Sequence, residues 1–298
     1  MSYHVPVLLN ESVGGLDIQP DGVYLDLTFG GGGHSGEILK HLKQGMLFGF
    51  DQDADALQNV INDKRFHFVH SNFRFFTNFL RYYNIEKVDR ILADLGVASH
   101  HFDEADRGFS FRYDALLDMR MNKASRINAG NVVNEYPQDE LIRIFKSYGD
   151  FPGVHRLVSG IISARRSRPI RKTKELAKLV VELLKPKNEN KILAQVFQAL
   201  RIEVNGEMEV LKQMLHKSAC SLNPGGRLVI ITYHSVEDRL VKNYFKSGNF
   251  SGVKEADIYG RSDVPFEIVN RKVITPDEKE IQQNSRARSA KLRIAEKN

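Results

Sequence analysis

Residues 23–35, VYLDLTFGGGGHS, decide the fold of this chain. They begin with an apolar, β-favouring run of strand length, and glycines 30–33 end that run. The segment that follows, HSGEILKHLK, places Ile38, Leu39 and Leu42 on one helical face. Glycines permit positive φ and a close approach of backbone to ligand, and the first N–H groups of a helix favour an anion or acceptor. The stretch therefore predicts a strand, a glycine turn and a helix that together form a ligand cradle.

The spacing within this stretch narrows the choice of ligand. Asp26 lies four residues before Gly30, which gives D-x-x-x-G-x-G, the start of the usual first motif of S-adenosylmethionine (SAM) methyltransferases. A dinucleotide fingerprint that begins at Gly30 needs glycine at position 35, where this chain has Ser35. His34 stands where the methyltransferase motif would end in glycine. A tight strand-to-helix turn with an acidic loop is the alternative interpretation.

A second acid follows at a distance that suits a nucleoside. Residues 46–51, MLFGFD, predict another strand, which ends in Asp51. A carboxylate roughly 20 residues after a glycine turn suits the paired hydroxyls of a ribose. Phe73 comes just past the third expected strand and is the candidate to pack on an adenine.

Composition limits the class of protein. The chain has 298 residues, 42% of them hydrophobic, and a net charge of +6, which allow about two domains and a polyanionic partner. No apolar run approaches the roughly 18 residues that cross a bilayer, so no membrane partner is expected. The N-terminus shows no signal-peptide pattern. The single Cys220 excludes a disulfide framework and a Cys-cluster zinc site, so we expect a cytoplasmic protein without a bound metal.

Strand and helix signals alternate in the first third of the chain, which predicts a parallel sheet with helices on both faces. Signals are mainly helical over residues 103–193, and strand signals return at Arg227. We therefore predict an α/β fold, a Rossmann-like (class I) SAM-dependent methyltransferase sheet with an inserted helical domain. The sheet domain is expected at 1–105 plus 205–298, and the substrate-recognition insertion at 106–204.

Individual elements follow from the same signals. Further strands are expected at 66–69, 88–95, 227–233, 266–275 and 290–295. Helices are expected at 54–61, 73–83, 137–148, 154–165 and 173–184. Three helix starts carry capping signals, at Thr173, at Ser235 with Asp238, and at Thr275 before Pro276.

Asp94 is a candidate for the reacting centre, because ligands of such sheets bind at the carboxyl ends of the strands. It is followed by Leu95-Gly96-Val97, at the place where amino-directed methyltransferases bind the target amine. An amine on a base ring needs an acceptor for its N–H hydrogens and an aligned methyl donor. Asp94 would be that acceptor or would hold the amino group of the donor. A buried turn acid is the alternative.

Two other residues bear on the chemistry. Methylation of carbon 5 of a pyrimidine needs a thiolate nucleophile, but Cys220 precedes the turn at 223–226 and does not follow the fourth strand. We therefore expect Cys220 to have a packing role. His234 follows the apolar run RLVIITY and is a catalytic candidate beside Asp94, or a structural residue next to a helix cap.

Clustered cations indicate contact with a polyanion. Residues 151–174 contain no acid and carry seven cations, namely Arg156, Arg165, Arg166, Arg168, Arg171, Lys172 and Lys174. The tail adds Arg286, Arg288, Lys291 and Arg293. Phosphate contact is the preferred interpretation, and a solvated helix face is the alternative. Separately, Gln198, Arg201 and Asn205 share a helical face, which would point to the active site or to solvent.

The whole chain resembles the bacterial 16S ribosomal RNA cytosine-N4 methyltransferase family, the RsmH or MraW methylases. The matching segments are HVPVLLNE (4–11), DLTFGGGGHS (26–35), DLGVAS (94–99), RGFSF (107–111), LDMRM (117–121), FQALRIEVN (197–205), HSVEDR (234–239) and SRARSAKLR (285–293). Any one match is weak, and all of them in this order are specific.

The resemblance implies methyl transfer from SAM to N4 of a cytidine in the decoding centre of 16S rRNA. It implies 16S rRNA or the small ribosomal subunit as partner and leaves a homodimer open. Carried onto the matching positions, it implies donor contacts at Gly32, Gly33, His34, Asp51, Phe73, Asp94 and His101. The family usually has glutamine where this chain has His101.

Other functions fit the sequence less well. An amino-methyltransferase acting on DNA or another RNA is the nearest alternative, although the D-P-P-Y motif of many DNA enzymes is absent. The glycine spacing opposes a nucleotide-dependent oxidoreductase. The acids at the strand ends oppose an RNA-binding protein with an inactive donor site.

Overall fold

The computed structural model describes residues 6–96, 105–255 and 263–298. The chain divides into two compact units, Met1–Gly96 with Glu209–Asn298, and Val97–Met208. We call the first the sheet unit and the second the helical unit. The sheet unit is built on a seven-stranded sheet, which confirms the predicted α/β fold class.

The strands of the sheet unit lie in the order β3-β2-β1-β4-β5-β7-β6. Strands β1 to β5 are parallel, and β7 runs antiparallel to both β5 and β6. The strand order reverses between β1 and β4, so a ligand crevice is expected at their carboxyl ends. The strands are β1 Val23–Asp26, β2 Met46–Asp51, β3 Phe66–His70, β4 Val88–Asp94, β5 Leu222–Thr232, β6 Phe266–Ile268 and β7 Lys291–Lys297.

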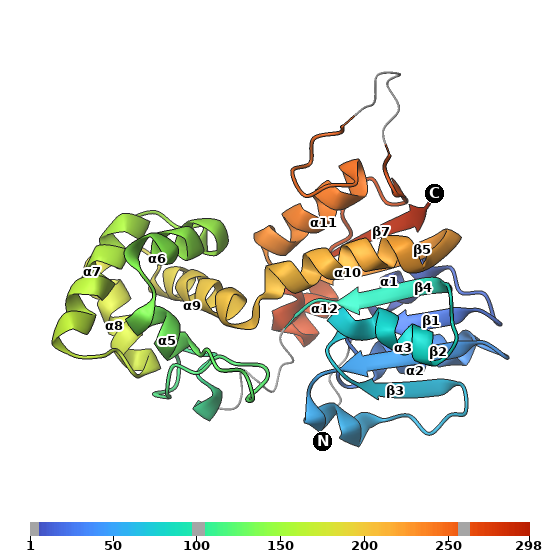
Figure 1. Ribbon diagram of the computed structural model, residues 1–298, viewed down its shortest axis with the longest axis horizontal. Helices are drawn as coiled ribbons and strands as arrows, with labels where there is room; N and C mark the ends of the chain where they lie inside the picture. The colour runs from blue at the N-terminus through green and yellow to red at the C-terminus, as the bar shows by residue number, and fades with distance from the viewer. Residues whose placement is uncertain (1–5, 97–104, 256–262) are drawn as a thin grey trace. The chain divides into compact units, whose positions relative to one another are not determined.

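Helices cover the sheet, and Figure 1 shows α3 and α10 in front of the strands. Apolar residues of α1 and α2, among them Leu16 and Ile38, are buried in one core with Leu47, Val229 and Leu292 of the strands. Each fully buried side chain of this kind stabilises the fold by roughly 1.5–3 kcal/mol. The helices are α1 Leu9–Leu16, α2 Gly33–His41, α3 Phe76–Tyr82, α10 Glu207–Ser221, α11 Ser235–Ser247 and α12 Glu278–Gln283.

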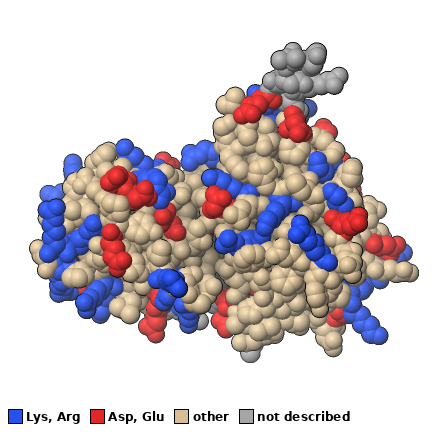
Figure 2. Space-filling model, in the orientation of Figure 1, with Lys and Arg blue, Asp and Glu red and all other residues tan. Residues whose placement is uncertain are grey.

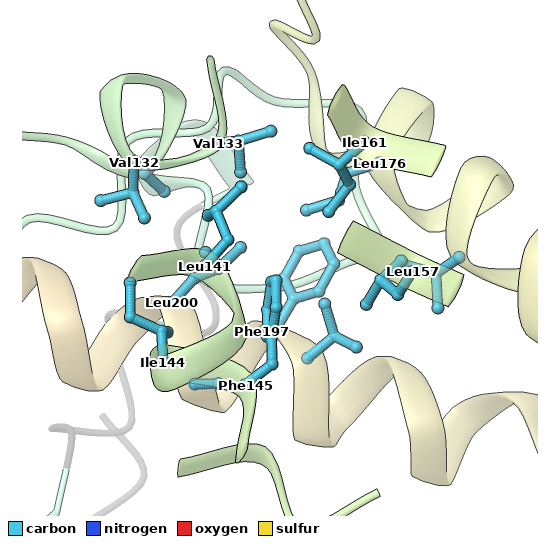
Figure 3. Packing of buried hydrophobic residues seen from close by; sticks show 14 of the residues in the cluster. Val132, Val133, Leu141, Ile144, Phe145, Leu157, Ile161, Leu176, Phe197 and Leu200 are labelled. Atoms are coloured by element: carbon cyan, nitrogen blue, oxygen red, sulfur yellow. The ribbon is translucent and has the colours of Figure 1, made fainter. Parts of the chain in front are cut away.

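The helical unit has a core of its own. Figure 3 shows Leu141, Ile144 and Phe145 turned toward Phe197 and Leu200, all of them buried. These side chains come from helices that are distant in sequence, so the core holds the unit together. Its helices are α5 Ala129–Glu135, α6 Gln138–Ile144, a π-helix at Phe145–Gly149, α7 Val154–Ser167, α8 Thr173–Leu184 and α9 Glu189–Asn205.

The predicted capping residue of α8 was wrong by one position. Helix α8 begins at Thr173, and Lys172 is its N-cap. The Thr173 hydroxyl donates to the Tyr113 carbonyl at 2.5 Å and accepts from the Ala115 N–H at 3.0 Å. The hydroxyl is therefore engaged by the loop before α5 and is not available to cap the helix.

The other two predicted caps were also displaced. Helix α11 is capped by His234, and Glu237 completes the capping box in place of Asp238. Helix α12 is capped by Asp277, which lies two residues after Thr275. In both cases another side chain accepts the N–H three residues on, His234 from Glu237 and Asp277 from Glu280.

Several expected elements are shorter or tighter than predicted. The expected helix at 54–61 is a 3-10 helix, Ala54–Asn59, and the one at 73–83 opens with a 3-10 turn, Phe73–Phe75. The expected strand at 266–275 ends at Ile268, and only Ile274 pairs again, with Leu292.

The packing role expected for Cys220 is wrong, because this residue is exposed. It lies in the last turn of α10, just before β5 begins at Leu222. The expected turn at 223–226 lies inside β5, where the pairing with β4 shifts register between Val88 and Arg90. Cys220 thus lies at the amino end of the strands, opposite the end at which ligands are expected.

Candidate functional site

The glycine turn connects the carboxyl end of β1 to the start of α2. Gly30 and Gly32 have φ angles of +51° and +75°, which side-chain-bearing residues rarely adopt. A Cβ on Gly32 would lie 2.9 Å from the ring of Phe29, so no side chain fits there. The turn brings the first N–H groups of α2 to the edge where the strand order reverses.

Asp26 is a buried carboxylate that holds the two ends of the glycine turn by hydrogen bonds. It is 1% exposed; its Oδ2 accepts from the Ser35 hydroxyl at 2.7 Å and its Oδ1 from the Thr28 N–H at 3.1 Å. Burial raises the pKa of the Asp26 carboxyl, while the charge of His34 and these two bonds lower it. Asp26 therefore connects β1 to α2 through hydrogen bonds inside the protein.

His34 ties the turn to the N-terminal segment. Its side chain is buried, and Nε2 lies 3.1 Å from the carbonyl oxygen of Val7. Beside it, a Cβ on Gly33 would lie 2.1 Å from Cγ of Pro6, so the segment packs directly on the turn. Nε2 of the His34 imidazole is therefore engaged within the protein.

Asp51 stands at the end of β2, next to the turn. Its Oδ2 accepts from the Gly30 N–H and its Oδ1 from the Asp53 N–H, both at 2.8 Å. Burial raises the pKa of Asp51, and these two bonds lower it. A carboxylate has about four lone-pair sites, so each oxygen can accept one more hydrogen bond. That arrangement suits two adjacent hydroxyls.

Phe73 follows β3 in a 3-10 turn. Asn72 caps this turn by accepting from the Arg74 N–H at 2.9 Å, and its amide donates to Gln52 at 2.6 Å. The loops after β3 and β2 are thereby joined. The ring of Phe73 is only half-buried, unlike the fully buried Phe76, so it can accept a planar group.

Asp94 ends β4, the neighbour of β1 at the reversal of strand order. Its N–H donates to Oγ1 of Thr28 at 2.7 Å, and the Tyr233 hydroxyl donates to its Oδ1 at 2.8 Å. Burial raises the pKa of Asp94, whereas the charge of His34 and the Tyr233 bond lower it. Its Oδ2 has no hydrogen-bond partner among the described residues and is the acceptor open to a ligand.

Tyr233 is held in place by the start of α11. Its N–H donates to Oε2 of Glu237 at 3.0 Å, and the Glu237 N–H donates to Nδ1 of His234 at 3.3 Å. Nε2 of His234 lies 3.1 Å from Oε1 of Glu237. A Cβ on Gly96 would lie 3.1 Å from the Tyr233 ring, so glycine leaves room for it. Burial raises the pKa of Tyr233 far above its usual range, so the hydroxyl keeps the proton it donates to Asp94.

The electrostatics of these strand ends fit SAM. Asp26, Asp51 and Asp94 all have raised pKa values because they are buried, and burying carboxylates costs free energy unless they are paired. SAM carries a positive sulfonium, a positive amino group and two ribose hydroxyls that donate hydrogen bonds. Such a ligand would offset the cost of burial, and the acceptors of Asp51 and Asp94 match its donors.

Two residues of this site were missed by the sequence reasoning. Tyr233 orients the carboxylate of Asp94, and Thr28 holds its backbone. The available signal was that Tyr233 closes the apolar run RLVIITY and so lies at the carboxyl end of the strand beside β4. The predicted donor contact His101 lies outside the described residues.

Some of the positive charges in the cation cluster, residues 151–174 of the helical unit, are paired with acidic residues. Figure 2 shows Lys and Arg gathered over the part of the helical unit that contains α7 and α8 in Figure 1. Within it, Arg168 pairs with Glu175, and Nζ of Lys172 lies 2.8 Å from Oδ2 of Asp114. Two of the seven cations therefore have acidic partners that lie outside residues 151–174.

The remaining cations are better placed for an external anion. Arg166, Arg171 and Lys174 are exposed, and their side chains form no ion pair within the described ranges. Arg165 is different, because it donates to the Val133 carbonyl at 2.9 Å. Three side chains thus remain free for phosphate.

The three polar residues on one face of α9 form hydrogen bonds within the helical unit. Gln198 donates to a carbonyl of the π-helix at 3.2 Å, and Arg201 makes two 2.9 Å bonds to Glu207. Asn205 accepts from the Met121 N–H at 2.7 Å. These bonds give the three side chains a structural role inside the helical unit.

The fold and the site define the class of protein. A parallel sheet that reverses order between β1 and β4, a glycine turn and acids at the ends of β2 and β4 make up a Rossmann-like SAM-dependent methyltransferase. S-adenosylmethionine is its methyl donor.

Comparison with known proteins gives the family. The model of the MraW methylase family matches residues 1–298, and the chain belongs to that family. It is 57% identical over 298 residues to ribosomal RNA small subunit methyltransferase H of Bacteroides thetaiotaomicron, covering 100% of this chain and 98% of that protein. The same-named protein of Christiangramia forsetii is 55% identical with the same coverage. The resemblance inferred from the motifs is confirmed.

Among solved structures, an rRNA methylase from Streptococcus thermophilus aligns with a TM-score of 0.44 at 11% identity, over 99% of this chain and 98% of that one. Within the described ranges, no helix combines the length and the apolar character needed to cross a membrane.

Proposed function

We propose that this protein transfers the methyl group of SAM to N4 of a cytidine in the decoding centre of 16S rRNA. Small-subunit rRNA is proposed as the substrate because two close relatives are named ribosomal RNA small subunit methyltransferases. The observation that carries the proposal is the carboxylate of Asp94, with Oδ1 bound by Tyr233 and Oδ2 open beside the donor turn. A single oriented acceptor is what an exocyclic amine requires for alignment.

The donor would be held from three strand ends. The two oxygens of Asp51 would each accept a ribose hydroxyl, and the ring of Phe73 would pack on the adenine. Gly32, Gly33 and His34 would contact the donor through backbone, since the His34 imidazole is bound to the N-terminal segment. His101 completes the set of donor residues that we propose.

The transfer would be a direct displacement. The N4 lone pair attacks the methyl carbon, the bond between carbon and sulfur breaks, and its electrons stay on sulfur as a neutral thioether. The methylated amine then loses a proton, and Asp94 or water takes it. Alignment of donor and acceptor can contribute about 7–11 kcal/mol. No enzyme nucleophile is needed, and Cys220 lies at the opposite end of the strands.

His234 would support this reaction as a positioning residue. Its Nδ1 accepts from the Glu237 N–H, and its Nε2 faces the same side chain at 3.1 Å. Glu237 in turn binds the N–H of Tyr233. His234 would therefore act on the amine only through Tyr233 and Asp94.

The helical unit would bind the RNA through its phosphate groups. Arg166, Arg171 and Lys174 of the helical unit are exposed cations available for this contact. Arginine suits phosphate because its guanidinium donates two parallel hydrogen bonds.

Nucleoside mass spectrometry of small-subunit rRNA from cells with and without this protein tests the proposal. We expect N4-methylated cytidine to be lost at one decoding-centre position when the protein is absent. Loss of a methylated base elsewhere in the RNA, or of 5-methylcytidine, would contradict it. Methylation of DNA by the purified protein would favour the alternative amino-methyltransferase.

A further inference from the structure

A recess of about 210 Å³ opens in the sheet unit at the start of α11. Its lining comes from three stretches of the chain. These are residues 233–235 between β5 and α11, Thr275, and residues 288–291, where the 3-10 helix Ser285–Ser289 leads into β7. The lining residues are Tyr233, His234, Ser235, Thr275, Arg288, Ser289, Ala290 and Lys291.

The recess carries an excess of positive charge. Arg288 is exposed and forms no ion pair or hydrogen bond with any residue that the structure describes. Nζ of Lys291 lies 3.2 Å from Oδ2 of Asp238, while Oδ1 of the same carboxylate accepts from Arg293 at 2.7 Å. One buried acid thus serves two cations, and Arg288 has no counter-ion in the described protein.

Hydroxyl donors accompany the cations. Ser235, Ser289 and Thr275 are all exposed, and they line the same recess as Arg288. Ser235 is also the first residue of α11, a helix of 13 residues, whose N-terminal end carries partial positive charge. A guanidinium surrounded by hydroxyls is the donor set of an oxyanion site, and it would recognise a phosphate.

The recess is joined to the reacting centre by one side chain. Tyr233 lines it, and the Tyr233 hydroxyl donates to Oδ1 of Asp94 at 2.8 Å. A nucleotide carries both a base and a phosphate on one sugar, so a single nucleotide could reach both places. A phosphate held in the recess would therefore be tied to the base whose amine meets Asp94.

From these observations we propose that the recess is a subsite for a backbone phosphate of the RNA at or next to the target cytidine. This inference rests on the proposed function and adds to it a phosphate contact made by the sheet unit. The contact would fix the register of the strand, so that one cytidine and not its neighbour reaches the donor.

The variant Arg288→Gln tests the subsite, and Arg81→Gln is its matched control. Arg81 is another exposed arginine of the sheet unit, located in the last turn of α3. We expect Arg288→Gln to raise the RNA concentration for half-maximal methylation roughly ten-fold, with unchanged SAM affinity; ten-fold corresponds to about 1.4 kcal/mol. Its plot of log affinity against log salt should be less steep by about 0.7–0.9. Equal RNA affinity in both variants would overturn the inference.

A second arm identifies which anion binds. RNA with a neutral methylphosphonate at the target position should bind the unmodified protein less tightly. It should cause no further loss in Arg288→Gln, because the two changes remove the same contact. Additive losses would contradict the subsite. So would inorganic phosphate that binds the protein without competing with RNA, since the recess would then serve a free anion.

Failure of this inference is distinguishable from failure of the proposed function. If the product is N4-methylcytidine and Arg288→Gln behaves as the unmodified protein does, only the subsite is wrong. If the product is different, the proposed function is wrong, whatever Arg288 contributes.

Discussion

The donor end of the sheet unit and the cation cluster of the helical unit would recognise their proposed ligands in opposite ways. At the donor end, Asp51 and Asp94 are largely enclosed, and each accepts fixed hydrogen bonds at 2.8 Å. In the cation cluster, Arg166, Arg171 and Lys174 are exposed. Charges held in a low dielectric act strongly and depend on geometry, whereas exposed charges are screened and act weakly one by one. Single substitutions should therefore be severe in the first region and mild in the second.

The most severe effect is expected for Asp94→Ala. It removes a carboxylate oxygen that has no partner in the described part of the chain, so turnover should fall by roughly 100-fold or more, the scale of a lost proton acceptor. Single-turnover methylation with saturating SAM measures this. Cys220→Ser is the control, because the cysteine is exposed at the other end of the strands and should be dispensable. Near-normal turnover of Asp94→Ala would contradict the expectation that single substitutions are severe at the donor end and mild in the cation cluster.

A large loss of donor affinity is expected for Asp51→Ala. The change removes the acceptor for two backbone N–H groups and for the ribose, and hydrogen bonds to charged groups contribute about 1.5–3 kcal/mol. Calorimetric titration with SAM measures the effect. Asp53→Ala serves as comparison, because Asp53 contacts Asp51 through its backbone N–H, which the variant keeps. Equal SAM affinity in the two variants would rule out the proposed ribose contact.

Phe73→Ala should weaken SAM binding while the fold is kept. Stacking of a base on an aromatic ring contributes roughly 1–3 kcal/mol, and the half-buried ring supports little of the core. Phe76→Ala should show the reverse, a loss of stability of about 3–5 kcal/mol, because Phe76 is fully buried. Thermal melting with and without SAM separates the two. If Phe73→Ala melts early even in excess SAM, Phe73 is a core residue.

A moderate, pH-dependent effect is expected for Tyr233→Phe. Burial raises the pKa of Asp94, and the Tyr233 bond is one of the contacts that lower it. The ionised carboxylate of Asp94 is a stronger hydrogen-bond acceptor and proton acceptor than the neutral acid, so activity should rise with pH through that pKa. Loss of the hydroxyl raises the pKa of Asp94, so the acid limb of kcat/KM should move to higher pH. An equal fall in rate at every pH would indicate a purely structural role for Tyr233.

The smallest effect per residue is expected in the cation cluster. Replacing Arg166, Arg171 and Lys174 by serine should make the salt dependence of RNA binding less steep by about 0.7 per lost phosphate contact. SAM affinity should not change. Arg168→Ser is the control, because that arginine is already paired with Glu175. If the triple variant and the control have the same slope, the cluster is a solvated surface.

The sequence predicts the glycine turn and the acids at the strand ends because their signals are local. The spacing from Asp26 to the glycines, and an acid directly after each strand, follow from the backbone geometry of a strand-turn-helix unit. Tyr233 could not be predicted in this way. Its bond to Asp94 joins residues 139 positions apart, and only the pairing of β4 with β5 brings them together.

Competition between partners explains the local errors. The Thr173 hydroxyl is a good helix cap in isolation, but the folded chain uses it to bind Tyr113 and Ala115. Cations that lack acids nearby in sequence find them elsewhere, as Lys172 does with Asp114. Such pairings depend on the tertiary structure, so they are harder to predict from the sequence than the glycine turn and the acids at the strand ends.

The most direct test of the account is methylation of small-subunit rRNA by the purified protein with isotope-labelled SAM, followed by nucleoside mass spectrometry. We expect label in N4-methylcytidine with the unmodified protein and with Cys220→Ser. Almost none is expected with Asp94→Ala, even when the donor is saturating. Label in 5-methylcytidine, or N4 label that persists in Asp94→Ala, would contradict the central claim that an oriented carboxylate at the end of β4 directs transfer to the amine.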